Sequence, residues 1–118
     1  MAKPEIFTSP MNAATVRRLA DETFGDMVKF VVDLEANIIC AGGGLHADEE
    51  TILLENGSQQ SGLWGGNYYP DLLGDDRWEY KSVINIRPRD GNPNQMVLSE
   101  ELRAKIRSLA QFFFEPKP

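Results

Sequence analysis

The sequence predicts an α+β domain with the element order α-β-β-α-β-α. Two segments carry apolar residues at the three- and four-residue spacing of amphipathic helices, two others alternate with the period of two typical of strands, and one further helix and one returning strand are expected between them. Three strands with three helices in this order favour a small three- or four-stranded sheet, mixed or antiparallel, with the helices packed mainly on one face. No internal repeat or linker is visible, so one domain is expected over residues 1–118, with a core from about residue 6 to 114 and frayed ends.

The composition is that of an ordinary globular domain. The 118 residues are 42% hydrophobic and 25% charged, which suits a single core. Ten glycines and seven prolines are scattered without period, and Cys40 is the only cysteine. These features exclude collagen, low-complexity disorder and a disulfide scaffold.

The first helix is expected to begin at Ser9-Pro10, because proline at the first helical position loses no hydrogen bond that the helix needs. It is expected to run to Phe24 and to stop at Gly25. Its predicted buried face comprises Val16, Leu19, Ala20 and Phe24.

A β-hairpin is expected to follow. From Met27 to Glu35 the side chains alternate, and Ile38 to Ala41 supplies a returning strand. The connection Ala36-Asn37 is short, and asparagine tolerates the positive φ that such a loop needs. The apolar side of the first strand comprises Val28, Phe30, Val32 and Leu34.

A second helix is predicted to begin near His46 or Ala47, with acidic residues in its first turn, and to end at Asn56-Gly57. The following stretch, Ser58 to Arg77, holds four glycines and several large rings, and it is interpreted as a long loop.

The third strand is predicted from Trp78 to Arg87, where the side chains alternate again. Residues 88–98 are rich in turn formers, and Ser99 is expected to cap a last helix. The predicted buried face of that helix comprises Leu102, Ile106, Leu109, Ala110 and Phe113.

Several short segments together resemble a known family. They read MVKFVVD (27–33), GLHAD (44–48), GSQ (57–59), LWGGN (63–67) and INIRP (84–88). This succession resembles a family of small, largely bacterial proteins of unknown function. The resemblance covers most of the chain and implies no activity, cofactor or catalytic residue.

The charge distribution narrows the range of partners. The net charge is −6, with four Lys/Arg and ten Asp/Glu in residues 1–59 and eight of each in residues 60–118. An isoelectric point near 4.7 opposes phosphate attraction, so no nucleic acid is expected as a partner. No apolar run has the length of a signal peptide or a membrane span, and one unpaired cysteine fits the cytoplasm, so a cytoplasmic protein without a membrane partner is expected.

The aromatic and glycine-rich stretch 57–70 suggests a ligand site. Large rings in a loop need something to cover, and an amide and a guanidinium would supply placed hydrogen bonds. The hypothesis is a small polar or anionic ligand bound beneath this loop, although the rings could equally cover a face of the sheet. The candidate ligand-binding residues are His46, Trp64, Asn67, Tyr68, Asn85 and Arg87.

A metal site is a weaker hypothesis. His46, Asp48 and Glu50 lie close together at the start of the second helix and offer one nitrogen and several oxygens. Acidic residues in a first turn are also expected from the helix dipole alone. No catalytic residue and no cofactor is assigned, and whether the protein is an enzyme stays open.

The alternative function is protein–protein interaction or self-association, for example as a homodimer. The aromatic loop or the Phe112-Phe113-Phe114 end of the last helix would supply the surface. Only Phe113 belongs to the predicted buried face, which leaves Phe112 and Phe114 for contact with a partner.

Overall fold

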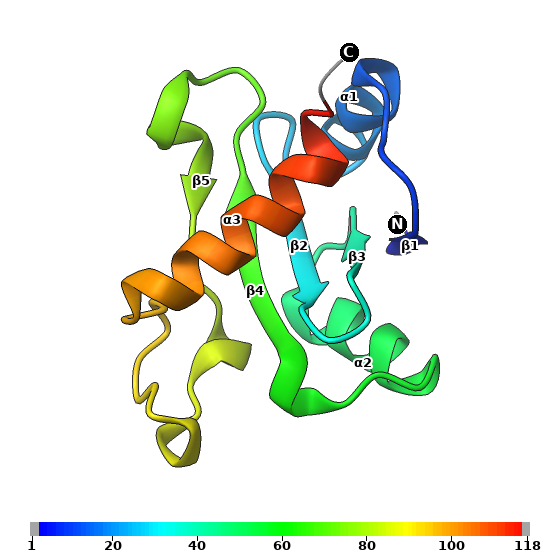
Figure 1. The fold of residues 1–118 in the computed structure, drawn as a ribbon. Coiled ribbons are helices and arrows are strands. Elements are labelled where there is room, and N and C mark those ends of the chain that lie inside the picture. The colour runs from blue at the N-terminus through cyan, green and yellow to red at the C-terminus, as the bar shows by residue number, and fades with distance from the viewer. Residues whose placement is uncertain (1–2, 117–118) are drawn as a thin grey trace.

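The computed structural model describes residues 3–116 as an α+β fold of three layers. Five antiparallel strands form one sheet in the order β1-β3-β2-β4-β5. Helices α1 and α3 cover one face of the sheet, and α2 covers part of the other (Figure 1). The predicted fraying concerns the chain ends, and residues 1–2 and 117–118 lie outside the described residues.

The strands comprise β1 (Glu5–Phe7), β2 (Val28–Asp33), β3 (Ile38–Ala41), β4 (Leu63–Tyr68) and β5 (Trp78–Glu79). The α-helices comprise α1 (Ala13–Asp21), α2 (His46–Glu55) and α3 (Glu100–Phe114). The predicted hairpin is confirmed as β2 and β3, with Asn37 at a φ of 58° in the turn. The predicted second and third helices are confirmed as α2 and α3, and Ser99 Oγ accepts a hydrogen bond from the Leu102 N–H at 3.1 Å.

The first helix is shorter than predicted. It begins after Asn12, whose Oδ1 accepts a hydrogen bond from the Thr15 N–H at 2.8 Å, so Asn12 and not Ser9 is the cap. It ends at Asp21, and Phe24 lies beyond it with 43% of its surface exposed. The expected burial of Phe24 is therefore wrong, whereas Val16, Leu19 and Ala20 are buried as predicted.

The largest correction concerns the stretch interpreted as a loop. Residues 63–68 form β4, which pairs with β2 along six residues. The expectation failed because Gly65-Gly66 interrupts the apolar alternation that marks a strand. Conversely, the third strand predicted to reach Arg87 is only the two-residue β5, because the chain turns into short 3₁₀ segments at Val83–Asn85 and Pro88–Asp90. The short edge strand β1 was not predicted.

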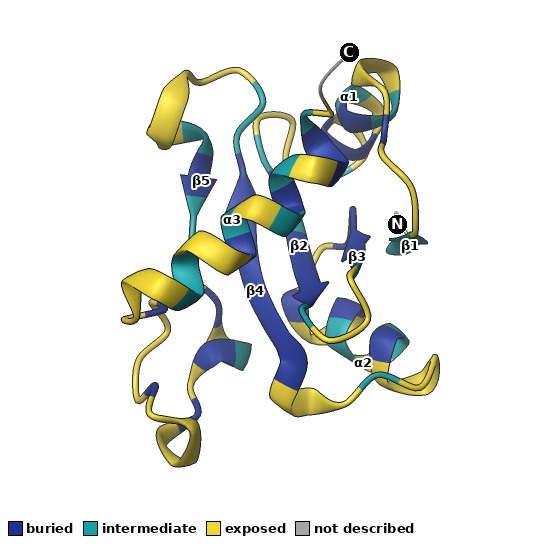
Figure 2. Ribbon diagram, in the orientation of Figure 1, coloured by how far each residue is buried: buried dark blue, intermediate teal, exposed yellow. Residues whose placement is uncertain are grey.

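The larger core lies between the sheet and helices α1 and α3. It takes Val28, Phe30 and Val32 from the predicted apolar side of β2, together with Ile106 and Phe113 of α3. Burial also runs along both central strands (Figure 2).

A smaller core fills the other face of the sheet. It joins Val31, Cys40, Leu53 and Leu63 beneath α2. Because α2 covers only part of this face, its N-terminal end leaves polar side chains of β2, β4 and β5 within reach of solvent.

Candidate functional site

One glycine of β4, Gly65, allows a histidine ring to contact the sheet. A Cβ atom at Gly65 would lie 3.2 Å from His46 Cδ2 and 2.7 Å from Ser82 Cβ, so any side chain there would push both residues away. The next residue, Gly66, accepts a hydrogen bond from His46 Nε2 through its carbonyl at 2.8 Å. Gly65 thus leaves room for the imidazole, and the Gly66 carbonyl holds the ring against the backbone of β4.

His46 is the first residue of α2 and is 8% exposed. Burial lowers its pKa from 6.5 to about 4, and the positive charge of Lys29 adds to this shift. The ring is therefore neutral at pH 7. Since Nε2 donates to the Gly66 carbonyl, Nδ1 carries the lone pair, and it can accept a hydrogen bond or a proton.

The imidazole borders an open depression of about 310 Å³ at the N-terminal end of α2. This volume is at the lower end of the roughly 300–1,000 Å³ typical of ligand pockets. Three neighbouring strands and the segment after β5 contribute polar side chains to the lining, among them Lys29, Asn67, Glu79, Lys81 and Ser82.

Asn67 lies at the centre of this lining and is 5% exposed. Its Nδ2 donates to Glu79 Oε1 at 2.7 Å, and the Tyr69 hydroxyl donates to the same oxygen at 3.1 Å. These bonds fix the orientation of the Asn67 amide. Its Oδ1 is buried and accepts no hydrogen bond from residues 3–116, an arrangement that costs free energy.

Two of the sequence-predicted site residues meet elsewhere. The Arg87 guanidinium stacks on the Trp64 ring at 3.7 Å from the centroid, and Arg87 Nη1 donates to the Gln60 carbonyl. Trp64 belongs to the core under α1 and α3 and is only 5% exposed. Burial lowers the pKa of Arg87, although Asp90 lies 3.5 Å from its Nε. This stack holds the 82–98 segment against the start of β4.

Asn85 bonds to the backbone of β4 and does not line the depression. It is fully buried, accepts a hydrogen bond from the Gly65 N–H at 2.9 Å and donates one to the Gly65 carbonyl at 2.9 Å. It also donates to the Gln95 carbonyl at 3.1 Å. The amide of Asn85 therefore bonds to the outer edge of β4 as a neighbouring strand would, and no amide proton remains for a ligand.

Tyr68 lies on the opposite face of the sheet from His46. Its ring stacks on Phe114 at a centroid distance of 4.6 Å and an interplanar angle of 13°. Its hydroxyl donates to Glu115, which also pairs with Arg77. Phe114 is 5% exposed, so its expected exposure is wrong, whereas Phe112 is 53% exposed.

The structure of residues 3–116 does not support the weaker hypothesis of a metal site at His46, Asp48 and Glu50. Within residues 3–116, no three His, Cys, Asp or Glu side chains are grouped so that they could hold a metal ion. Asp48 is exposed to solvent, and the His46 ring is turned toward β4. Cys40 is fully buried, and burial raises the pKa of its thiol, as expected for a core residue.

Of the six predicted ligand-binding residues, the structure brings His46 and Asn67 together in one depression. Sequence reasoning missed Lys29 and Glu79 at the same place. Both stand on the polar side of alternating segments, which was visible, but only the pairing of β2, β4 and β5 aligns them with Asn67. This alignment could not be predicted, because the sequence did not indicate that residues 63–68 form a strand.

Fold and site together define a small three-layer α+β domain with a neutral, buried histidine beside an open polar depression. The chain belongs to the family "Protein of unknown function (DUF5674)", whose model matches residues 5–113. Neither the curated proteins nor the solved structures include a match to this chain. In the part of the chain from residue 3 to 116, no helix has the length and apolarity needed to cross a bilayer.

Proposed function

We propose that this domain binds a small polar ligand in the depression beside His46. The observation that carries the proposal is the buried, neutral imidazole, held by the Gly66 carbonyl and bordering a depression of about 310 Å³. Buried polar groups with shifted pKa values that face a cavity are characteristic of binding and catalytic sites. The unpaired Oδ1 of Asn67 supports the same interpretation. A buried oxygen without a hydrogen-bond partner costs free energy, and such groups are common at functional sites.

The site moves away from the position that the sequence suggested. Because residues 63–68 are a strand of the sheet, they cannot cover a ligand as a loop would. The ligand is proposed to lie against the face of β4 that carries Asn67, with His46 at one side and Glu79 at the other. Trp64, Tyr68, Asn85 and Arg87 then serve the fold.

A thermal-shift screen with a library of polar metabolites tests this proposal. Compounds that bind the depression should raise the Tm of the wild-type protein and have a much smaller effect on Glu79→Gln, which retains an oxygen to accept from Asn67 and Tyr69. Glu101→Gln, on the exposed surface of α3, is the matched control and should respond as the wild type does. A library in which every stabilising compound acts equally on all three proteins would contradict the proposal.

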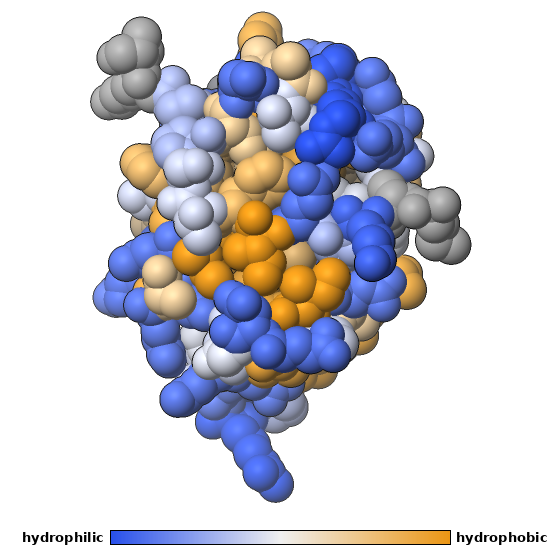
Figure 3. Space-filling view, turned by 90° about the vertical axis from the view of Figure 1, so that its right-hand side faces the viewer, coloured by the Kyte–Doolittle hydropathy of each residue, from blue (hydrophilic) through white to orange (hydrophobic). Residues whose placement is uncertain are grey.

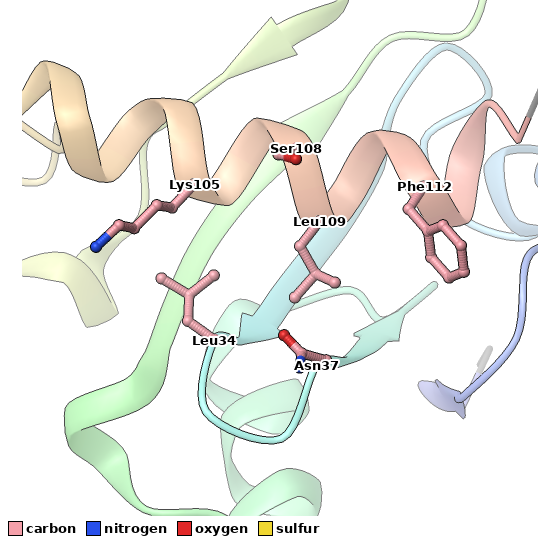
Figure 4. Close-up of a pocket in the computed structure, with 6 residues that line it drawn as sticks. All are labelled: Leu34, Asn37, Lys105, Ser108, Leu109 and Phe112. Atoms are coloured by element: carbon pink, nitrogen blue, oxygen red, sulfur yellow. The ribbon is translucent and has the colours of Figure 1, made fainter.

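Interaction with another protein, or self-association, is the second candidate function. It is favoured by the exposed ring of Phe112, which borders two surface depressions of about 360 and 640 Å³. The smaller one lies between α3 and the β2–β3 turn, where Leu109 points toward Leu34 and Asn37 (Figure 4). Apolar side chains also gather in one patch, ringed by polar ones, on the side where α1 and β1 lie (Figure 3).

Sedimentation velocity over a range of concentrations tests this second candidate. A mass that rises with concentration in the wild type and stays monomeric in Phe112→Ser would support it. Since Phe112 is exposed, the substitution should leave the fold intact, and circular dichroism checks this. A monomer at all concentrations would contradict self-association.

A further inference from the structure

Two opposite charges lie on either side of Asn67 without pairing to each other. Lys29 of β2 is the register partner of Asn67, and Asn67 is the register partner of Glu79 in β5. Register partners point to the same face of a sheet, and neighbouring strands lie about 4.8 Å apart, so the Lys29 and Glu79 backbones are separated by roughly 10 Å. A cation (Lys29), an amide (Asn67) and an anion (Glu79) therefore lie in one row across the sheet.

Neither charge is neutralised by a partner in the described part of the chain. The ion pairs found within residues 3–116 include neither Lys29 nor Glu79. The Lys29 ammonium lies 5.2 Å from the centroid of the Phe24 ring, a contact that leaves its hydrogen-bond donors free. Glu79 uses Oε1 for both of its protein hydrogen bonds, while Oε2 accepts none from the described residues.

The groups between and beside these charges suit a ligand with two charged ends. His46 Nδ1 is a neutral acceptor, so it can accept a hydrogen bond from an ammonium without repelling it. Lys81, on the rim, adds a second cation to the lining. Charge-assisted hydrogen bonds are roughly twice as strong as neutral ones, so matched charges at both ends would dominate recognition.

We propose that the depression binds a zwitterion of the amino-acid class, with its carboxylate at Lys29 and its ammonium between Glu79 Oε2 and His46 Nδ1. This assignment rests on the proposed function, because it names the ligand class of the same site. An anion alone would satisfy Lys29 and leave Glu79 unpaired and close to a second negative charge. A cation alone would leave Lys29 unpaired.

The only imidazole in the chain provides a direct readout. His46 is the single histidine of the 118 residues, so the ring signals in a long-range ¹H–¹⁵N correlation spectrum report on this site alone. The probes are glycine, β-alanine and γ-aminobutyrate as zwitterions of increasing length, acetate as the anion and methylammonium as the cation, all at pH 7 and constant ionic strength. At least one zwitterion should shift the His46 signals with an affinity roughly tenfold above those of acetate and methylammonium, a factor that corresponds to about 1.4 kcal/mol.

Charge-removing variants define which end binds where. Glu79→Gln should lower the affinity for the best zwitterion to about that of acetate, and Lys29→Met should lower it to about that of methylammonium. Glu101→Gln and Lys105→Met are the matched controls, because this exposed pair lies on α3 in the opposite layer, and both should bind as the wild type does.

The outcomes separate the two proposals. If acetate or methylammonium shifts His46 as strongly as any zwitterion does, the zwitterion assignment is overturned and the ligand site stands. If none of the five probes shifts the His46 signals, the zwitterion assignment is overturned, and the metabolite screen decides on the site itself.

Discussion

At the scale of single residues, the environment of His46 makes the stability of the protein depend on pH. The pKa of the folded state, about 4, lies below the ordinary value of 6.5. Between these values the unfolded chain binds a proton that the folded protein does not bind, so stability falls as the pH decreases from about 6.5 to 4. This contribution is fully present above pH 6.5, and its total size is on the order of 3 kcal/mol.

Two measurements check this prediction. The His46 ring signals should titrate with a pKa near 4, and the free energy of unfolding should fall between pH 6.5 and 4.5 more steeply for the wild type than for His46→Gln. The carboxyl of Glu49 changes the pH dependence of stability in the opposite direction. Burial raises its pKa, so protonation at low pH removes the free energy cost of burying its charge. An imidazole that titrates near 6.5 would show that the ring is solvated rather than held against Gly66.

Residue chemistry was only partly readable from the sequence. His46 could be singled out because it is the only histidine, and Asn67 because it supplies an amide among the rings of residues 57–70. Lys29 and Glu79 could not be placed with them, since a charged residue at every second position of a strand is equally typical of a solvated face. The role of Asn85 was also hidden, because a side chain that bonds to both backbone groups of Gly65 has no pattern in the sequence.

At the scale of elements, the two glycines of β4 lie where neighbouring atoms leave no room for a side chain. A Cβ atom at Gly66 would lie 2.6 Å from Phe30 Cζ and 2.8 Å from the carbonyl oxygen of Glu79, and the latter cannot move without disturbing β5. Gly66→Ala should therefore lower the free energy of unfolding by about 1–3 kcal/mol, the usual cost of overpacking. Chemical denaturation measures this loss.

Gly44→Ala is the matched control for this prediction. A Cβ atom at Gly44 would have no neighbour within 4 Å, and Gly44 is not among the glycines with positive φ. Its substitution should leave stability unchanged or raise it slightly, because alanine restricts the unfolded chain. Equal losses in both variants would mean that Gly66 is not packed as described.

Elements with a clear signal in the sequence were predictable, and the others were not. The 3.6-residue pattern located α3 and the two-residue pattern located β2, because each carries apolar residues along one face, whereas α2 was located by its acidic first turn and β3 by its apolar run after a short connection. β4 was missed because Gly65 and Gly66 remove the side chains that would show its alternation. The segment after β5 alternates without being a strand, because it turns into a 3₁₀ segment at Val83–Asn85.

At the scale of the whole molecule, the sheet couples two cores that lie on opposite faces. Trp64 and Trp78 belong to the core under α1 and α3, whereas Cys40 belongs to the core under α2. β2 supplies alternate residues to both, so neither core can open without disturbing the same strand. We expect one cooperative unfolding transition.

Thiol labelling and fluorescence test this cooperativity together. Cys40 is fully buried and its thiol pKa is raised, so it should resist a thiol reagent in the native protein. The denaturant midpoint of its labelling should coincide with that of tryptophan fluorescence. Labelling that precedes the fluorescence change would reveal that α2 detaches from the sheet on its own.

The side-chain amide of Asn85 also has a consequence for solubility. An unpaired strand edge offers a template on which other chains can add, and this is how many β-proteins aggregate. Beyond the two residues that pair with β5, the outer edge of β4 is closed at Gly65 by a side chain rather than by a strand. One amide group thus occupies the backbone groups of Gly65 that a strand from another chain would otherwise bond to.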